Sequence, residues 1–374
     1  MNHPQYHPAI SGAEIFWAEQ QPFLAKKGYH LRPRFSAHWR RKIRILPTER
    51  EDDIPSYQGF VLDATRIRDK KKVVLKRVET GDEELVLHSY LDSPALRSDP
   101  RNRTIPILEV FRLPETQWSI LVTPYCREFD YPPFHCRQEF IDAMSQYLEG
   151  LEFMHEHNIA HIDIAPQNML MDESQVVPKG SHFSRPRTQD GISELFCWND
   201  RCSVGHVDYF YIDFGLSEYF PEGTTDARRI GRLRTFPEIP ELSWEVPYNP
   251  FLVDVFQLGL TMHKLIYGYP SLEIFRPVAD AMTARNPSER AKPGQSLAHL
   301  RAIAATIPPQ ELSSQIWDLA ATEKHKRERA TLGGYRQDYR YIRDEVLYDI
   351  AVTRPPKTAY MRPKATGSSV NGLN

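Results

Sequence analysis

The spacing of hydrophobic positions divides the chain into a first part that favours β-strands and a second part that favours helices. In the first part, apolar and β-branched residues form short runs bounded by charged or proline-containing turns. The runs lie at 60–62, 72–78, 105–111 and 118–125. Between the second and third runs, leucines follow Gly81-Asp82 as far as Leu91, which predicts one helix beside the strands.

Beyond residue 138 the period of the pattern changes to that of a helix. Apolar side chains recur at helical spacing from 139 to 157, which predicts a long buried helix. Further helical stretches are expected at 253–266, 272–285, 294–306 and 310–350. The segment 173–205 has no clear periodicity, so we interpret it as an insertion. The pattern as a whole favours an α+β fold with the strands first.

The two ends of the chain differ from this pattern. Residues 1–50 mix apolar patches with a basic cluster at 40–44 and an acidic one at 49–53, and we expect a solvated extension packed on the domain edge. From Arg354 the chain is rich in Pro, Lys, Gly and Ser, which predicts a disordered tail over 354–374.

Composition narrows the function classes. The chain has 374 residues, of which 41% are hydrophobic and 26% charged, with a net charge of −2. So small a charge gives no bulk reason to expect binding to nucleic acid or to an anionic membrane. No run reaches the roughly 18 apolar residues of a membrane span. The first residues lack the layout of a signal peptide, so we expect an intracellular protein of the cytoplasm or nucleus.

The four cysteines do not indicate a disulfide framework in a chain of this length. Cys197 and Cys202 have a C-x4-C spacing inside the insertion, with His182 and His206 nearby. A zinc site needs tetrahedral Cys and His ligation, and a second clear pair of ligands is missing. Two reduced cysteines are therefore the better interpretation.

The strongest chemical signal runs from His161 to Met171. Asp163 and Asn168 lie between apolar flanks there, and Asp213-Phe214-Gly215 follows further on. One carboxylate, Asp163, can face an attacking hydroxyl group, while Asn168 and Asp213 supply the oxygen ligands that Mg²⁺ prefers. Together they can support phosphoryl transfer from a nucleotide.

A lysine and a glutamate extend this candidate site. Lys76 ends an apolar run, where a lone cation would be poorly solvated, so it needs an anionic partner. Glu84 lies on the predicted helix at a position from which it can reach Lys76. Taken alone, such a pair is more often a surface ion pair worth less than about 1 kcal/mol.

The order of these signals resembles the eukaryotic protein kinase family over roughly 54–305. Lys76 and Glu84 resemble the phosphate-binding lysine and its helix partner, and the stretches at 161–168 and 213–215 resemble the catalytic loop and the metal-binding motif. Three later stretches also match in order: 240–241, 254–259 and 286–290. Several segments resemble the expanded kinase sets of mushroom-forming fungi: 62–66, 99–102 and 246–251.

The resemblance implies a bilobal protein kinase-like fold, with a small β-rich N-lobe holding one main helix and a larger, mostly α-helical C-lobe. The expected division is 1–50 for the N-terminal extension, 51–125 for the N-lobe, 126–310 for the C-lobe, 311–353 for a helical C-terminal extension and 354–374 for the tail. It also implies ATP and Mg²⁺ as cofactors and a protein as substrate.

The resemblance assigns residues to the nucleotide as well. Lys76 would bind the α- and β-phosphates, and Gly59 would end the glycine-rich loop. The adenine would lie between Val61, Val74 and Leu170. The hinge contacts would come from Thr123 as gatekeeper, the Pro124 carbonyl and the Cys126 amide.

Four positions depart from the family pattern. Ile54 and Ser56 stand where two glycines would let the backbone approach the phosphates, which weakens the expected phosphate cover. Ile162 replaces the arginine that grips a phosphorylated activation segment, so we do not expect switching by phosphorylation there. Ala165 replaces a lysine that steadies the transferred phosphate, and Gln167 does not supply the arginine that tyrosine kinases add.

Two expectations concern the C-lobe. Arg290 is expected to form a salt bridge with Glu241 at the end of the activation segment. Only 36 positions separate Asp254 from Arg290. That is short for the family, so the helix that often docks protein substrates is expected to be reduced or absent.

Three functions fit these observations. The leading hypothesis is an ATP- and Mg²⁺-dependent protein kinase acting on Ser or Thr hydroxyls, with Asp163 as the residue that orients the hydroxyl. The second is a pseudokinase scaffold, favoured by the four departures. The third is a small-molecule phosphotransferase of the aminoglycoside or choline kinase type, whose catalytic loop is similar but which lacks the later motifs. The oligomeric state stays open.

Overall fold

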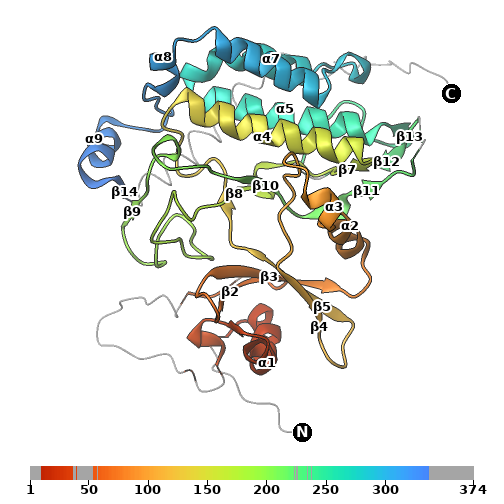
Figure 1. The fold of residues 1–374 in the computed structure, drawn as a ribbon, viewed down its shortest axis with the longest axis vertical. Helices are drawn as coiled ribbons and strands as arrows, with labels where there is room; N and C mark the ends of the chain where they lie inside the picture. Colours follow the sequence, from red (N-terminus) through yellow and green to blue (C-terminus); the bar gives the residue numbers. More distant parts are fainter. Residues whose placement is uncertain are drawn as a thin grey trace, which may run out of the picture.

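The protein is bilobal (Figure 1). The computed structural model describes the following residues: 10–36, 39, 54–56, 58–222, 224, 226–233, 235–236 and 238–336. A smaller lobe built on an antiparallel sheet lies against a larger lobe made mostly of helices. The basic cluster at 40–44 and the tail at 354–374 lie outside the described residues.

The sheet of the N-lobe has five strands in the order β1-β2-β3-β5-β4. Their bounds are Tyr29–His30, Val61–Arg66, Lys72–Glu79, Trp118–Pro124 and Glu109–Arg112, in that spatial order. The register places Lys76 of β3 opposite Val61 of β2 on one side and opposite Leu121 of β5 on the other. The expected run at 105–111 becomes a strand only from Glu109, and Pro106, which has no N–H to donate, lies before it.

Side chains alternate across this sheet and separate two environments. Leu62 and Leu75 face a hydrophobic cluster that also contains Trp17 and Leu24 of α1 (Gly12–Lys26). Figure 1 shows α1 on the side of the sheet that faces away from the C-lobe. Part of the segment expected as a solvated extension therefore belongs to the N-lobe core, because α1 covers an apolar face that would otherwise be open to water.

The predicted helix of the N-lobe is α2 (Glu83–Leu91), and α3 (Pro94–Arg97) follows it. The Asp82 carboxylate accepts a hydrogen bond from the Glu84 N–H at 3.2 Å, which satisfies one of the unpaired N–H groups at the helix start. Starting the helix there places Glu84 in its first turn, facing β3.

The C-lobe is built around α4 (Arg137–Glu156) and α5 (Pro250–Gly268), the two long helices that the periodicity predicts. The other α-helices are α6 (Arg276–Met282), α7 (Pro293–Ala305), α8 (Pro309–Ser313) and α9 (Glu323–Leu332). Short 3-10 helices occur at Pro33–Phe35, Pro166–Asn168, Arg201–Ser203, Phe214–Leu216, Pro270–Phe275 and Pro287–Glu289. Between α5 and Arg290, where every residue is described, one α-helix forms, the seven-residue α6. Whether it replaces the docking helix that was expected to be reduced or absent stays a prediction.

Small antiparallel sheets of two or three strands lie in the C-lobe beside these helices. The strands are β6 (Arg127–Glu128), β7 (Ile159–Ala160), β8 (Met169–Met171), β9 (Leu195–Cys197), β10 (Tyr209–Tyr211), β11 (Glu218–Tyr219), β12 (Arg229–Gly231), β13 (Ser243–Tyr248) and β14 (Gly334–Arg336). Because β7 pairs with β11 and β8 with β10, the loops after β7 and β10 lie side by side.

The segment 173–205 makes contacts with both lobes. Glu173, at its start, binds the buried Arg127 at 3.3 Å and accepts hydrogen bonds from the Ser181 N–H and hydroxyl. The Ser181 carbonyl in turn accepts a hydrogen bond from Lys72 of β3 at 2.6 Å, and its hydroxyl lies 3.0 Å from the Tyr125 hydroxyl. At its other end β9 pairs with β14, so the insertion is folded against the body of the protein.

Across the part of the chain that the structure describes, no helix has both the length and the apolar character needed to cross a lipid bilayer.

Candidate active site

The loop after β7 is held by one buried carboxylate. Asp254 of α5 is fully buried, and its two oxygens accept hydrogen bonds from the backbone N–H groups of His161 and Ile162 at 2.8 and 2.6 Å. His155 also lies 2.9 Å from Asp254, so the buried charge has several partners. Carboxylates that accept charge-assisted hydrogen bonds of this kind fix a backbone firmly. Asp254 therefore sets the path of the catalytic loop.

Ile162 adopts a conformation that β-branched residues rarely adopt, with φ of 69°. Gln257, one turn further along α5 than Asp254, holds the loop around it. The Gln257 amide group donates to the Ile162 carbonyl and accepts from the Ile164 N–H, both at 2.9 Å. Such a backbone costs on the order of 1–3 kcal/mol and persists only where surrounding bonds enforce it. Gln257 was not among the predicted site residues.

Asp163 and Asn168 lie together, as their spacing predicts. The Asn168 amide nitrogen donates to the Asp163 carbonyl at 3.0 Å and to its carboxylate at 2.9 Å. This commits the nitrogen side of the amide to Asp163 and leaves the oxygen side for a cation. The other carboxylate oxygen of Asp163 accepts a hydrogen bond from the Thr235 hydroxyl at 2.9 Å. The Thr235 hydroxyl thus reaches the carboxylate that is expected to accept a proton from the substrate. In the sequence, the position of Thr235 six residues before Glu241 was the signal that could have indicated this contact.

Asp213 follows β10 with φ of 66°, a left-handed conformation that turns the chain sharply. Its side chain is about half exposed, and one oxygen lies 2.8 Å from the Lys76 ammonium. The next residue, Phe214, is buried and packs between the tilted rings of His88 of α2 and His161, at ring distances of 4.9 and 5.3 Å. Burial lowers the pKa of His161, so its ring is neutral, and it contacts the Ile212 carbonyl at 3.1 Å.

Lys76 reaches two carboxylates at once. Its ammonium forms a salt bridge with Glu84 of α2 as well as with Asp213. Burial alone would lower the pKa of Lys76, but the two carboxylates outweigh it and the pKa is raised. The lysine is therefore charged across the neutral range. The surface-pair interpretation of Lys76 and Glu84 fails, because only 9% of the Glu84 side chain is exposed.

Three of the residues expected around the adenine, Val61, Val74 and Thr123, share the face of the N-lobe sheet that carries Lys76. Val74 of β3 lies opposite Thr123 of β5, and Val61 lies opposite Lys76. Both valines are partly exposed, as is Leu170 on β8, whereas Thr123 is buried. Pro124 ends β5, and the buried Cys126 follows two residues later.

The segment before β2 is packed against protein rather than left as an open loop. Ile54 is buried, and its carbonyl accepts a hydrogen bond from Arg32 at 3.1 Å. The Ser56 N–H donates to Glu14 of α1 at 2.8 Å. Gly59 is partly exposed, and its carbonyl accepts a hydrogen bond from Trp17 at 3.2 Å. Thus the two positions that lack glycine fasten this segment to the N-terminal part of the lobe.

The end of the activation segment is anchored as expected. Both guanidinium nitrogens of Arg290 bind the Glu241 carboxylate, one of them at 2.8 Å, and Arg290 also donates to the Leu252 carbonyl at 2.8 Å. Arg290 is 4% exposed, so this is a buried, bidentate pair. The predicted salt bridge is confirmed.

Ile162 and Ala165, which stand where basic residues were expected, are both fully buried. They belong to an apolar cluster that spans the activation segment and α5. Its other members are Ala160, Phe220, Ala227, Leu233, Phe236, Ile239, Leu242, Tyr248, Val253, Phe256 and Leu260. Among the described residues, the contact of the activation segment with positions 162 and 165 is therefore made by hydrophobic packing.

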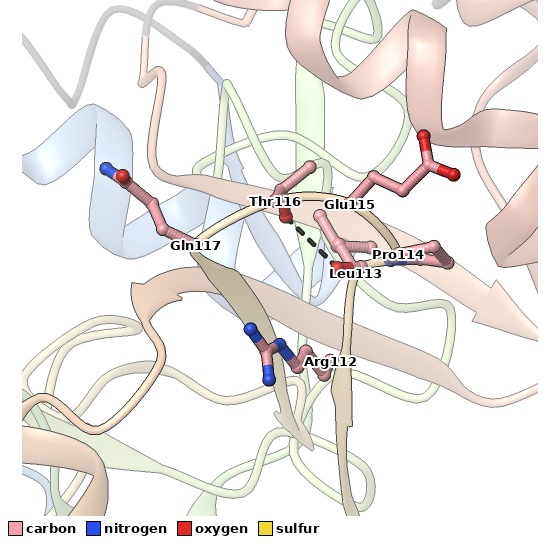
Figure 2. Close-up of a pocket in the computed structure, with 6 residues that line it drawn as sticks. All are labelled: Arg112, Leu113, Pro114, Glu115, Thr116 and Gln117. Atoms are coloured by element: carbon pink, nitrogen blue, oxygen red, sulfur yellow. Dashed lines mark hydrogen bonds between the residues drawn. The ribbon is translucent and has the colours of Figure 1, made fainter.

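A hollow of about 520 Å³ elsewhere on the N-lobe does not belong to this site. Figure 2 shows that it surrounds the turn between β4 and β5, where the Thr116 hydroxyl donates to the Leu113 carbonyl. None of the predicted site residues lines it. The residues predicted to be catalytic converge instead between the lobes, from β3, α2 and the loops after β7 and β10.

The family model for the protein kinase domain matches residues 57–331 of the chain. The chain belongs to the protein kinase family. This kinase domain is similar, at low identity, to several curated proteins. It is 22% identical over 204 residues to a probable casein kinase II subunit alpha homolog of Encephalitozoon cuniculi, covering 54% of this chain and 52% of that protein.

Two other relatives are similar over shorter stretches. The human serine/threonine-protein kinase ULK3 is 22% identical over 171 residues, which is 43% of this chain and 29% of that protein. A light-sensor protein kinase of Ceratodon purpureus is 24% identical over 156 residues, which is 38% of this chain and 10% of that protein. The kinase thus spans about half or less of the curated relatives it matches.

Proposed function

We propose that this kinase transfers the γ-phosphate of ATP to Ser or Thr hydroxyls of a protein substrate. The observation that carries the proposal is the position of Lys76, which pairs with Glu84 and Asp213 together. A lysine held in this way by α2 and by the metal-binding segment is in place to receive phosphates without further rearrangement. The relatives with serine/threonine-kinase names support the choice of hydroxyl.

The residues fit a magnesium ion. Asn168 and Asp213 offer hard oxygen ligands from adjacent loops, and the amide of Asn168 already has its nitrogen bound to Asp163. When bound, Mg²⁺ would neutralise charge on the phosphate oxygens. Asp163 orients the acceptor hydroxyl and takes its proton, while Lys76 holds the α- and β-phosphates. Val61, Val74, Leu170 and the 123–126 segment would contact the adenine.

The test is transfer of labelled phosphate from Mg-ATP to a general acceptor protein such as dephosphorylated casein, in single turnover. Asp163→Asn should lower the transfer rate about 10²–10⁴-fold, the usual contribution of a positioned acid or base. Lys76→Ala should abolish nucleotide binding measured by calorimetry. Glu115→Gln, in the exposed β4–β5 turn, is the matched control and should leave the rate unchanged.

Transfer that survives unchanged in Asp163→Asn would contradict this mechanism. The second candidate, a pseudokinase scaffold that binds nucleotide weakly or not at all, is favoured by the burial of Ile54, Ser56 and Ala165 in protein contacts, and it predicts no turnover of Mg-ATP. The third candidate, a small-molecule phosphotransferase, is disfavoured because Arg290 pairs with Glu241, a contact of the protein-kinase activation segment.

A further inference from the structure

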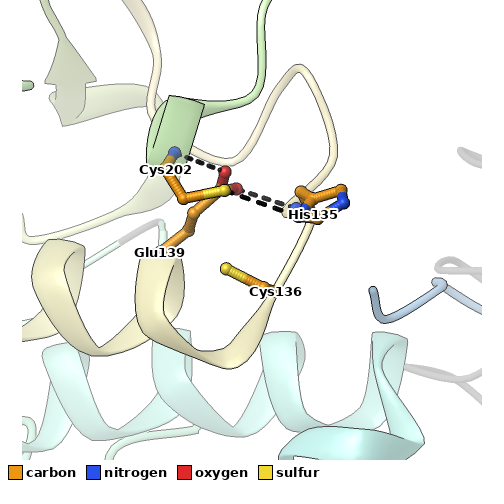
Figure 3. A group of neighbouring side chains, drawn as sticks. All are labelled: His135, Cys136, Glu139 and Cys202. Atoms are coloured by element: carbon orange, nitrogen blue, oxygen red, sulfur yellow. Dashed lines mark hydrogen bonds between the residues drawn. The ribbon is translucent and has the colours of Figure 1, made fainter. Parts of the chain in front are cut away.

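Four side chains with metal-binding atoms meet at the start of α4, away from the active site. His135, Cys136 and Glu139 come from the first turn of α4 and the residues before it, and Cys202 comes from the 3-10 helix Arg201–Ser203 in the insertion (Figure 3). One ligand atom from each residue lies within 4.8 Å of all the others. The family match does not assign a role to any of the four.

The distance between the Cys202 sulfur and a ring nitrogen of His135 matches that of two ligands in a tetrahedral zinc site. The Cys202 sulfur lies 3.5 Å from Nδ1 of His135. Zn–S bonds of about 2.3 Å and Zn–N bonds of about 2.0–2.1 Å, at a tetrahedral angle, separate sulfur and nitrogen by about 3.5 Å. The ring also has a carboxylate on its far side, since Nε2 of His135 lies 3.9 Å from Asp200. A carboxylate there orients a metal-binding imidazole.

Glu139 fixes the backbone of two of these residues. Its carboxylate accepts hydrogen bonds from the His135 N–H at 2.7 Å and from the Cys202 N–H at 2.9 Å. The buried Arg201 lies 3.5 Å from the same carboxylate. Cys136 is fully buried beside them. These hydrogen bonds position His135 and Cys202 through their backbone N–H groups and do not use the thiol or the imidazole.

We propose that His135, Cys136 and Cys202, with Glu139 in the fourth position, bind a zinc ion that fastens the insertion to α4. Two thiolates and an imidazole select a soft or borderline ion of this kind over Mg²⁺. The three negative charges of the two thiolates and Glu139 are balanced by the ion together with Arg201. Because α4 also packs against the catalytic strands, the ion would tie the insertion to the rigid part of the C-lobe.

In the sequence, the C-x4-C spacing of Cys197 and Cys202 was the signal for a metal site. In the structure, the group of metal-binding atoms around Cys202 includes Cys136 and not Cys197. The Cys197 sulfur instead donates to the Leu332 carbonyl at 3.4 Å. The remaining ligands come from a segment more than sixty residues earlier, so the pair could not be recognised from spacing alone. The sequence near Cys197 and Cys202 has no second pair of ligands, and in the structure His135 and Cys136 supply it.

The test is the metal content of the full chain purified without chelator and without metal-affinity resin. We expect about one equivalent of zinc per chain. After removal of zinc and loading with Co²⁺, thiolate-to-cobalt charge-transfer absorption should appear. Cys202→Ser and His135→Gln should each lose both signals, and Cys197→Ser should keep them. Far-UV circular dichroism of each variant shows whether it has folded.

Three results would overturn the proposal. The first is a folded native chain that carries no zinc and gives no cobalt spectrum after loading. The second is a cobalt spectrum that Cys202→Ser leaves intact. The third is a disulfide between Cys136 and Cys202, found by peptide mass spectrometry of the unreduced protein, because it would assign the two sulfurs to a redox pair.

Discussion

At the scale of single residues, His88 has an unusual position. It lies on α2 four residues after Glu84, is 2% exposed, and packs its ring against Phe214, the residue after Asp213. Burial lowers its pKa from 6.5 to about 4, against the pull of the Ile105 carbonyl, which lies 2.7 Å from Nε2. Nearby charges act in both directions, since Asp92 raises the pKa and Arg97 and Lys76 lower it. The ring is therefore neutral at neutral pH.

This burial predicts that His88 makes the fold acid-sensitive. The folded pKa lies below the unfolded one, so the unfolded chain takes up a proton first as the pH falls from 6.5 toward 4. The shift corresponds to about 3 kcal/mol of unfolding free energy, present above pH 6.5 and lost across that window. In urea denaturation, His88→Leu should flatten the pH dependence by about this amount, apart from a constant loss for the Ile105 contact.

The exposed His299 provides the control for this experiment. His299→Gln should keep the pH dependence of the native chain. A slope that is the same in His88→Leu and in the native chain would mean that other buried histidines, such as His182 with a pKa lowered to about 3 chiefly by burial, carry the effect.

At the scale of elements, the activation segment packs against the loop that follows β7. Its contact with the catalytic loop is apolar at Ile162, in a cluster that includes Phe220 and Phe236. A hydrophobic contact of this kind does not depend on a modification that adds charge. Within the described part of the segment, this packing and the Glu241–Arg290 pair both contribute to its arrangement.

We predict that restoring the family arginine at this position is harmful. Ile162→Arg would place an unpaired cation in a fully buried apolar cluster and should lower the unfolding free energy by about 3 kcal/mol or more. Cleavage of the activation segment by a protease should increase in parallel. Ile162→Leu keeps the apolar volume and should cost less than about 1.5 kcal/mol. An arginine variant as stable as the leucine variant would show that a carboxylate or solvent reaches this site.

Residues fixed by local elements are predicted from the sequence more fully than residues placed by long-range contacts. The five predicted site residues lie together as their motifs predict: Lys76, Glu84, Asp163, Asn168 and Asp213. Each is fixed by a local element, and the order of these elements along the chain indicates the protein kinase family. The roles of Gln257 and Thr235 depend on how α5 and the activation segment approach the loop. Such long-range contacts leave no periodic pattern, and the same is true of α1 on the sheet.

At the scale of the whole molecule, the insertion connects the two lobes beside the hinge. Its Ser181 contacts Lys72 on β3 and the Tyr125 side chain, while Glu173 holds Ser181 and Arg127 together. Gly191 lies against Ile54 so closely that a Cβ would approach the isoleucine side chain to 2.3 Å. The relative position of the lobes is therefore restrained by a segment that shows no helical or strand period.

Removing one charge from this restraint should loosen it. Glu173→Gln leaves the buried Arg127 without its anionic partner and should lower the unfolding free energy by about 1–3 kcal/mol. Limited proteolysis should then cleave the insertion faster, which mass spectrometry of the fragments detects. Glu194→Gln, on the same insertion but 79% exposed, is the control. Equal effects of the two substitutions would mean that Glu173 does not hold the insertion.

The helix α1 has a practical consequence for anyone who expresses part of this protein. The family match begins at residue 57, yet Trp17, Leu24 and Phe35 are fully buried in the same core as the sheet. Glu14 joins this region to the segment before β2 by accepting hydrogen bonds from Arg34 and Ser56. A fragment cut at the family boundary would leave the outer face of the sheet as an open apolar surface, which favours aggregation. The core of the N-lobe therefore includes residues that precede the family match.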